Sequence, residues 1–226
     1  MYMKVSIIVP AFNEEKNIKD FLIEISSRFP ESEIIVVCNG CTDRTPEIAK
    51  SIRKSNVKTI VLPEPGKGAA VLKGFEMAEN DYLGFVDADR AFRIEDIEKI
   101  VDELKKYDCV IASKWKGQKF SDVNWPITKK IPGRVWNFLV RHLLKLDFED
   151  TQAGVKFLRR KVYETIDKNF ICTGFEFDIE LLLKIKRKGF RMKEIYTPVQ
   201  NSKKSSFNIS HTPRMFYNLI RLWLRY

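Results

Sequence analysis

The sequence predicts an α/β fold whose mostly parallel central sheet is covered by helices. In the first half of the chain, short apolar runs alternate with segments whose apolar residues recur every three to four positions, which is the βαβ pattern. The chain has 226 residues, of which 44% are apolar and 31% charged, so it is long enough to bury one substantial core. No stretch approaches the roughly 18 consecutive apolar residues of a membrane-spanning helix.

The elements of the first half follow one another in alternation. Strands are predicted at Lys4–Val9, Glu33–Val37, Lys58–Leu62, Tyr82–Val86 and Val110–Ser113. Helices are predicted between them, at Glu14–Arg28, Thr45–Ser55, Gly68–Glu79 and Ile94–Tyr107. Because the N-terminus runs directly into the strand-like "KVSIIVP", we expect no signal peptide.

The amino-acid composition changes at the start of the second half of the chain. Residues Lys114–Lys130 are rich in lysine, proline and glycine, and a long loop of this kind in a compact domain is usually a lid or a binding loop. A helix is predicted over Arg134–Lys145, and the stretch "FEDTQAGVKFLRR" follows it without an assigned element. We then expect a helix around Phe177–Lys188, a strand near Met192–Ile195 and a last helix over "TPRMFYNLIRLWLRY".

The formal net charge of +10 has two interpretations. A lysine-rich solvated surface explains it, as does attraction to an anionic partner such as nucleic acid, a phosphorylated substrate or a membrane surface. The basic residues are scattered, with no recognition helix or aromatic platform, so nucleic acid is not the expected partner. Four cysteines suggest no disulfide framework, which favours a reducing cytosol. Cys38 and Cys41 form a C-x-x-C that is more typical of a turn than of a zinc or redox site.

Polar loops follow four consecutive strands. They read "PAFNEE", "CNGCTDRT", "PEPGKGAA" and "DADRAF". In parallel sheets ligands bind at the carboxyl ends of the strands, so these loops converge on one site if the strands are adjacent. In the third loop, Gly66, Lys67 and Gly68 precede a helix whose free N–H groups would suit an anion.

Asp87 and Asp89 in "FVDADRAF" admit three interpretations: a metal site, a ribose-binding acid or a hydrated turn. Asp87 lies about twenty residues after the glycine loop, as a ribose-binding acid of a dinucleotide fold would. That loop follows the third strand rather than the first, however, and a ribose acid leaves Asp89 unexplained. Two carboxylates just past a strand also suit Mg²⁺ or Mn²⁺, which bind to one or two carboxylates together with diphosphate oxygens.

The order of these motifs resembles the GT-A glycosyltransferases of family 2. The resemblance rests on "VSIIVPAFNEEKNI", the "CNGCTDRT" loop, "GKGAAVLKG" and "DYLGFVDAD", and covers about residues 3 to 115. In the second half, "DTQAGVKFLRRKVYETI" and "FEFDIELLLKIKRKGFRMKEIYTPV" resemble the synthases of polyprenyl-phosphate glucose and mannose. The resemblance implies a GT-A fold, with a catalytic domain over residues 1–210 made of a nucleotide half, 1–115, and an acceptor half, 116–210.

The resemblance also implies roles for individual residues. Nucleotide-sugar binding is expected of Pro10, Ala11, Asn13, Glu14, Asn39, Lys67, Asp87, Ala88 and Asp89. Asp89, together with Asp87, would hold Mg²⁺ or Mn²⁺ on the diphosphate. Asp150 and Gln152 would lie at the donor sugar and the reacting centre. Asp178 falls near the position where other members of the family place a catalytic base.

Departures from the family pattern bear on the donor. The family usually has Asp-Asp where this chain has Cys38 and Asn39, and often has a lysine where it has Phe207 in "SKKSSFN". Ala91 stands two residues after Asp89, as in the glucose synthases, whereas mannose synthases tend to have a glutamine there. We therefore expect UDP-glucose as the donor, with GDP-mannose next.

The implied reaction is an inverting transfer of a hexose to a membrane polyprenyl (dolichyl) phosphate. A phosphate is already a nucleophile, so it needs cationic positioning rather than a strong base. Lys114, Arg134 and Arg159 are the residues expected to supply that charge. Two alternatives remain: a glycan hydroxyl acceptor, for which Asp178 would be the base, and a non-catalytic nucleotide-binding module.

The last helix, within residues 211–226, has an amphipathic pattern. One side of the helix is apolar and consists of Met215, Phe216, Leu219, Ile220 and Trp223. Basic residues fall on the other side. Apolar and basic faces with a tryptophan describe an interfacial helix, but the same pattern also describes a helix packed on its own core. We expect a cytoplasmic protein that contacts the cytoplasmic face of a membrane peripherally, and leave open a membrane partner that anchors it.

Overall fold

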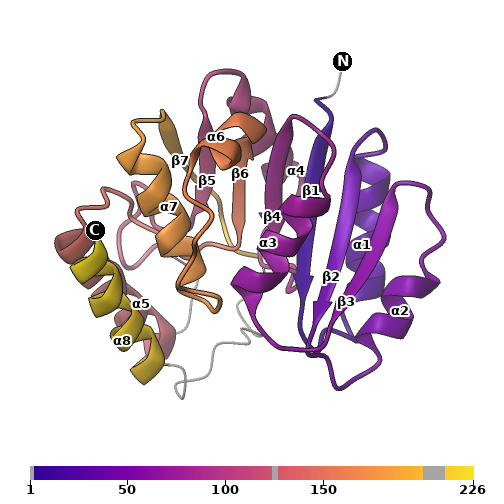
Figure 1. Ribbon diagram of the computed structural model, residues 1–226, viewed down its shortest axis with the longest axis horizontal. Coiled ribbons are helices and arrows are strands. Elements are labelled where there is room, and N and C mark those ends of the chain that lie inside the picture. Colours follow the sequence, from indigo (N-terminus) through magenta and orange to yellow (C-terminus); the bar gives the residue numbers. More distant parts are fainter. Residues whose placement is uncertain (1–2, 124–126, 201–211) are drawn as a thin grey trace.

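The computed structural model describes residues 3–123, 127–200 and 212–226, and contains a seven-stranded sheet in the order β3-β2-β1-β4-β6-β5-β7 (Figure 1). The strands are β1 (Val5–Ala11), β2 (Glu33–Asn39), β3 (Val57–Leu62), β4 (Tyr82–Val86), β5 (Cys109–Ser113), β6 (Val155–Arg159) and β7 (Met192–Tyr196). All the strands expected from the sequence are present, which confirms the mostly parallel sheet.

Helices cover both faces of the sheet. They are α1 (Ile18–Arg28), α2 (Thr45–Ser51), α3 (Lys67–Met77), α4 (Ile94–Asp102), α5 (Ile127–Leu144), α6 (Arg160–Thr165), α7 (Phe177–Arg187) and α8 (Thr212–Arg225). Apolar residues of α1, α2 and α4 pack on one face of the sheet, whereas those of α3, α5, α6, α7 and α8 pack on the other. Successive residues of a strand point to opposite faces of the sheet. Ile7 and Val9 of β1 therefore pack with α1, α2 and α4, whereas Ile8 packs on the other face.

Strand β6 is a strand that the sequence pattern did not assign, and the short helix α6 that follows it was not assigned either. Strand β6 pairs antiparallel with β4 on one side and with β5 on the other, whereas all other pairs in the sheet are parallel. The reversed strand separates β4 from β5, which are consecutive in the sequence. Strands β4 and β5 therefore still point the same way, and their carboxyl ends lie at the same edge of the sheet.

Several predicted bounds shift in the structure. Helix α1 begins at Ile18 rather than at Glu14, because the backbone N–H of Glu14 is bonded to the Thr45 hydroxyl in a turn before the helix. Helix α5 begins at Ile127, so the basic loop is shorter than Lys114–Lys130. Among the described helices, none is both long and apolar enough to cross a bilayer.

Candidate active site

A cavity of about 300 Å³ opens at the carboxyl edge of the sheet. Strand β1 lies between β2 and β4 in the sheet, so the strand order reverses direction at β1. The cavity lies at this topological switch point. The predicted residues that line the cavity are Pro10, Glu14, Asn39, Lys67, Asp87, Ala88 and Asp89. Gly66, which the sequence placed in the glycine loop, also lines it, and the lining residues that sequence reasoning missed are Phe12, Pro65, Gly174, Phe175, Glu176 and Arg214.

The loop after β1 is held from behind by two predicted residues that do not line the cavity. Ala11 is buried, and its carbonyl accepts a hydrogen bond from the Asn39 amide at 3.0 Å. Asn13 has a positive φ of 54°, and its side-chain carbonyl accepts the backbone N–H of Thr42 at 2.9 Å. These residues join the first two loops and are not among the residues that line the cavity.

Asn39 links three loops. In addition to its bond to Ala11, its side-chain oxygen accepts the backbone N–H of Gly66 at 3.0 Å. The N–H groups of Gly68 and Ala69, at the start of α3, donate to the carbonyl of Thr173 at 2.8 and 3.3 Å. The helix terminus predicted to offer free N–H groups to an anion is therefore capped by the loop before α7, and that expectation is wrong.

Asp87 and Asp89 border the cavity on the loop after β4. Asp89 is partly buried, and its Oδ1 accepts the backbone N–H of Ala91 at 3.0 Å. Burial, followed by the charge of Asp87, raises the pKa of Asp89 to about 7. A divalent cation would stabilise the ionised form of this carboxylate, and the two carboxylates leave its remaining positions for diphosphate and water, so the donor set fits Mg²⁺ or Mn²⁺.

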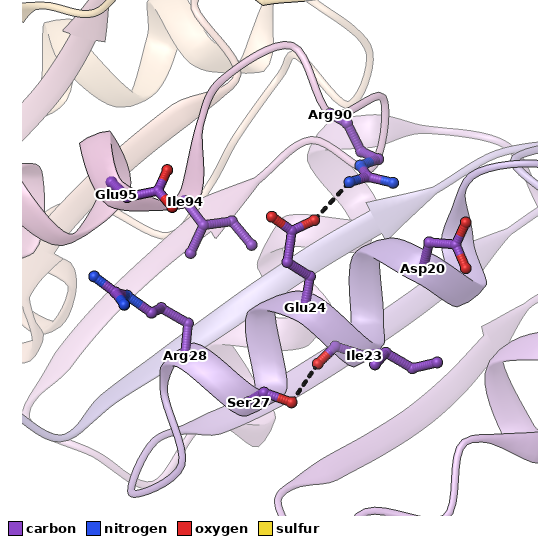
Figure 2. A pocket seen from close by; sticks show the side chains of 8 residues that line it. All are labelled: Asp20, Ile23, Glu24, Ser27, Arg28, Arg90, Ile94 and Glu95. Atoms are coloured by element: carbon purple, nitrogen blue, oxygen red, sulfur yellow. Dashed lines mark hydrogen bonds and ion pairs between the residues drawn. The ribbon is translucent and has the colours of Figure 1, made fainter.

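The carboxylate loop is fastened to α1 on its outer side. Arg90 has a positive φ of 57°, and its guanidinium forms an ion pair with Glu24 at 2.6 Å (Figure 2). This contact lies in an open groove of about 620 Å³ that also includes Ile94 and Arg28. The groove has acidic and basic side chains side by side, and the Arg90–Glu24 ion pair within it ties the loop after β4 to α1.

Asp178 lies beneath the cavity and does not line it. Its two oxygens are bonded to Lys156 at 2.6 Å and to Lys67 at 3.2 Å, and its side chain is 1% exposed. Although burial favours the neutral acid, Lys156 and Lys67 hold the pKa of Asp178 below its ordinary value. In this structure both oxygens of the carboxylate are therefore bonded to lysines, and neither faces the cavity in the way expected of a base.

Lys114 and Arg134, two of the three residues predicted to bind the acceptor phosphate, lie at the same edge of the sheet, outside the cavity lining. The ammonium of Lys114 is bonded to the buried carboxylate of Asp150 at 2.7 Å. The guanidinium of Arg134 lies 5.0 Å from the ring centre of Trp115. The Gln152 amide donates to the carbonyl of Phe175 at 3.4 Å and so connects this region to the loop before α7.

Arg159 is far from the other predicted acceptor residues. It pairs with Tyr82, the first residue of β4, and its guanidinium donates to the carbonyls of Leu104 and Tyr107. Because β6 runs antiparallel to β4, the last residue of β6 lies at the amino edge of β4, opposite the cavity. The expectation that Arg159 binds the acceptor phosphate is therefore wrong.

The C-x-x-C pair has the geometry of a turn. Cys38 is buried at the end of β2, and the Cys41 thiol donates to the carbonyl of Ala11. Burial raises the pKa of Cys38 to about 12, so this thiol is not ionised near neutral pH. Over the described residues, no cluster of three or more histidine, cysteine or acidic side chains is arranged to hold a metal by itself.

Comparisons with known proteins agree with this arrangement. The family model described as "Glycosyl transferase family 2" matches residues 6–167. The chain is 34% identical to a dolichol-phosphate mannosyltransferase of Pyrococcus furiosus, over 80% of this chain and 53% of that protein. It is 29% identical to the dolichyl-phosphate beta-glucosyltransferase ALG5D of Trichomonas vaginalis, over 98% of this chain and 73% of that protein. It is 30% identical to the glycosyltransferase AglD of Haloferax volcanii, over 85% of this chain and 32% of that protein. The chain thus spans about a third of AglD and about half of the mannosyltransferase.

Solved structures share the fold. Mannosyl-3-phosphoglycerate synthase of Rubrobacter xylanophilus has a TM-score of 0.74 at 18% identity, over 99% of this chain and 73% of that one. Glucosyl-3-phosphoglycerate synthase of Mycobacterium tuberculosis, crystallised with Mn²⁺, UDP and its product, has a TM-score of 0.69 at 19% identity, over 96% and 77%. The chain therefore has the GT-A fold. It belongs to glycosyl transferase family 2.

Proposed function

We propose that this protein transfers a hexose, with inversion, from a nucleotide sugar to a membrane polyprenyl phosphate. The observation that carries the proposal is the state of Asp178, whose oxygens are both bonded to lysines. A hydroxyl acceptor would need this carboxylate as its base, whereas a phosphate acceptor is an anion near neutral pH and needs none. The names of the mannosyltransferase and glucosyltransferase relatives support a dolichyl-phosphate acceptor.

The cavity residues divide into a nucleotide side and a metal side. Pro10, Glu14 and Asn39, from the loops after β1 and β2, are proposed to contact the nucleoside. Asp89 and Asp87 would hold Mg²⁺ or Mn²⁺, which would neutralise charge on the leaving diphosphate. Lys67, from α3, and Arg214, from α8, line the same cavity and would add positive charge beside the diphosphate.

Lys114 and Arg134 are proposed to position the acceptor phosphate. Both lie at the carboxyl edge of the sheet, on the side of β5. Asp150 holds the Lys114 ammonium, and Gln152 connects this region to the cavity loop through Phe175. A phosphate placed by these cations could attack the anomeric carbon in line with the diphosphate.

We propose UDP-glucose as the donor, with GDP-mannose next. Ala91 favours UDP-glucose, while the named relatives include both a glucosyltransferase and a mannosyltransferase. The direct test incubates the protein with labelled UDP-glucose or GDP-mannose, with and without polyprenyl phosphate in membranes. We expect a labelled lipid that forms only with the phosphate acceptor, and faster from UDP-glucose. A product formed only on a hydroxyl acceptor would contradict the proposal.

We further propose that α5 and α8 form the membrane contact. The two helices pack against each other, with the rings of Trp136 and Phe216 5.4 Å apart (Figure 1). Met215, Leu219 and Leu222 of α8 are buried in the core, so the helix does pack on its own protein. A second apolar face stays exposed. Its large residues are Ile127, Ile131, Val135 and Phe138 on α5, and Phe216, Ile220, Trp223 and Leu224 on α8.

This arrangement corrects the single apolar face predicted for α8. Met215 and Leu219 face inward together with Asn218, whereas Phe216 and Ile220 face outward. Exposed arginines accompany the outer apolar residues, among them Arg221. Apolar side chains flanked by cations are typical of an interfacial helix on an anionic membrane. The motif "SKKSSFN" and His211 lie outside the described residues.

Acidic substitutions on the outer face test this contact. We expect the double variant Ile220→Asp, Trp223→Asp to bind anionic phosphatidylserine vesicles at least about tenfold more weakly, because each lost side chain contributes on the order of 2 kcal/mol when buried in lipid. Vesicle flotation is the measurement. Ile23→Asp is the control, since Ile23 is an exposed apolar residue of α1 on the other side of the sheet. Equal flotation of the double variant and the wild type would exclude this face.

A further inference from the structure

A buried row of alternating charges runs from the protein interior to the cavity. Lys156 is bonded to Asp178 at 2.6 Å, Asp178 to Lys67 at 3.2 Å, and Lys67 to Asp87 at 3.0 Å. The exposed fractions of the side chains rise along this row, from 0% and 1% at Lys156 and Asp178 to 12% and 29% at Lys67 and Asp87. Only the last member lies beside the expected metal.

The inner pair has no direct access to a substrate. Lys156 is the second residue of β6, at a position where a strand buried on both faces would ordinarily have an apolar residue. Its ammonium also donates to the carbonyl of Ala153 at 2.7 Å, and the ring of Phe85 lies beneath both Lys156 and Lys67, at 5.4 and 5.1 Å from the ring centre. Buried ion pairs can often be exchanged for apolar residues without loss of stability, so folding alone does not require this pair.

We propose that Lys156 and Asp178 are positioning residues that set the net charge presented to the metal and diphosphate. This inference rests on the proposed function of the cavity. Asp178 balances one side of the Lys67 ammonium, and Lys156 neutralises Asp178, so that the row has two positive and two negative members. Lys67 is thereby shared between Asp178 and Asp87 rather than held by Asp87 alone.

The proposal predicts effects of opposite sign when either inner residue is neutralised. Without Asp178, the row carries an excess positive charge, and Lys67 is left to pair with Asp87 alone, so a divalent cation should bind more weakly. Without Lys156, the row carries an excess negative charge, and Asp178 competes with Asp87 for Lys67, so the cation should bind more tightly. Removing both charges restores the balance. A merely structural pair would shift the cation affinity in one direction or not at all.

The test measures the dissociation constant of Mn²⁺ alone by electron paramagnetic resonance. We expect Lys156→Met to tighten Mn²⁺ binding and Asp178→Asn to weaken it, each by on the order of tenfold for a unit charge buried nearby. The double variant should return to within about threefold of the wild type. Lys156→Arg keeps the charge, so it should keep the Mn²⁺ affinity even if its thermal stability falls.

Control variants separate the expected change in Mn²⁺ affinity from effects of net charge and of misfolding. Lys58→Met removes the same charge from an exposed pair with Glu33 and should leave Mn²⁺ binding unchanged. If Lys156→Met fails to fold, Asp178→Asn and the double variant still decide the outcome. Shifts of the same sign in both single variants, or a double variant that does not recover, would overturn the inference while the metal site stands. A wild-type protein that binds neither Mn²⁺ nor UDP or GDP would overturn the proposed function and the inference together.

Discussion

Replacing Asp89 with asparagine is expected to lower kcat/KM for hexose transfer by about a thousandfold, because a bound cation contributes several kcal/mol of transition-state stabilisation. Asp89 borders the cavity on the loop after β4, and its carboxylate is the group assigned to the metal. Asparagine keeps the shape of the side chain and removes its charge. The loss should therefore appear both in turnover and in the Mn²⁺-dependent binding of the nucleotide sugar, measured by calorimetry.

A matched variant distinguishes metal binding from a general loss of acidity. Asp20→Asn removes an exposed carboxylate from α1, in the groove on the outer side of the same loop, and should leave the transfer rate unchanged. If Asp89→Asn binds nucleotide sugar with an undiminished dependence on divalent cations, Asp89 is not the metal ligand.

Replacing Gly154 with alanine should weaken Mn²⁺–nucleotide binding by about tenfold to a hundredfold, as expected for the loss of a charged contact. Gly154 lies directly before β6, and its carbonyl accepts the backbone N–H of Asp87 at 2.8 Å. A Cβ atom at Gly154 would lie 2.3 Å from Oδ2 and 2.8 Å from Cβ of Asp87. The added methyl group would therefore displace the whole Asp87 side chain, which in turn holds Lys67.

Gly133→Ala supplies the comparison for this substitution. Gly133 lies within α5, and a Cβ atom there would meet no atom within 4 Å. Alanine at that position should slightly raise stability through its helix propensity, without a change in nucleotide binding. Calorimetric titration of both variants with UDP in Mn²⁺ makes the comparison, and unaltered affinity in Gly154→Ala would remove Asp87 from the site.

The sequence was most informative where local pattern decides structure. Polar loops after consecutive apolar strands predicted which residues meet at the carboxyl edge, because parallel neighbouring strands end at the same side of a sheet. Asp87 and Asp89 followed from this reasoning together with the family resemblance. Arg214 did not, because nothing in the pattern of α8 indicates that its first turn reaches a cavity formed by the loops of β1 and β4.

Strand direction and side-chain pairing were beyond local pattern. The five residues of β6 do not show which way the strand runs, and its reversal placed Arg159 at the wrong edge for a phosphate. The sequence also could not show that both oxygens of Asp178 are bonded to lysines. Its partner Lys156 is 22 residues away in the sequence, and only the packing of α7 against β6 brings the two together.

The reversed strand also restricts how this protein can be divided or recombined. Strand β5 belongs to the first 115 residues, but its two neighbours, β6 and β7, both come later in the chain. A fragment ending at residue 115 would leave β5 without any partner strand and β4 with an open edge, and unpaired edges of this kind promote aggregation. Chimaeric transferases that exchange acceptor halves should therefore inherit residues 82–196 from one parent, with the junction placed before β4.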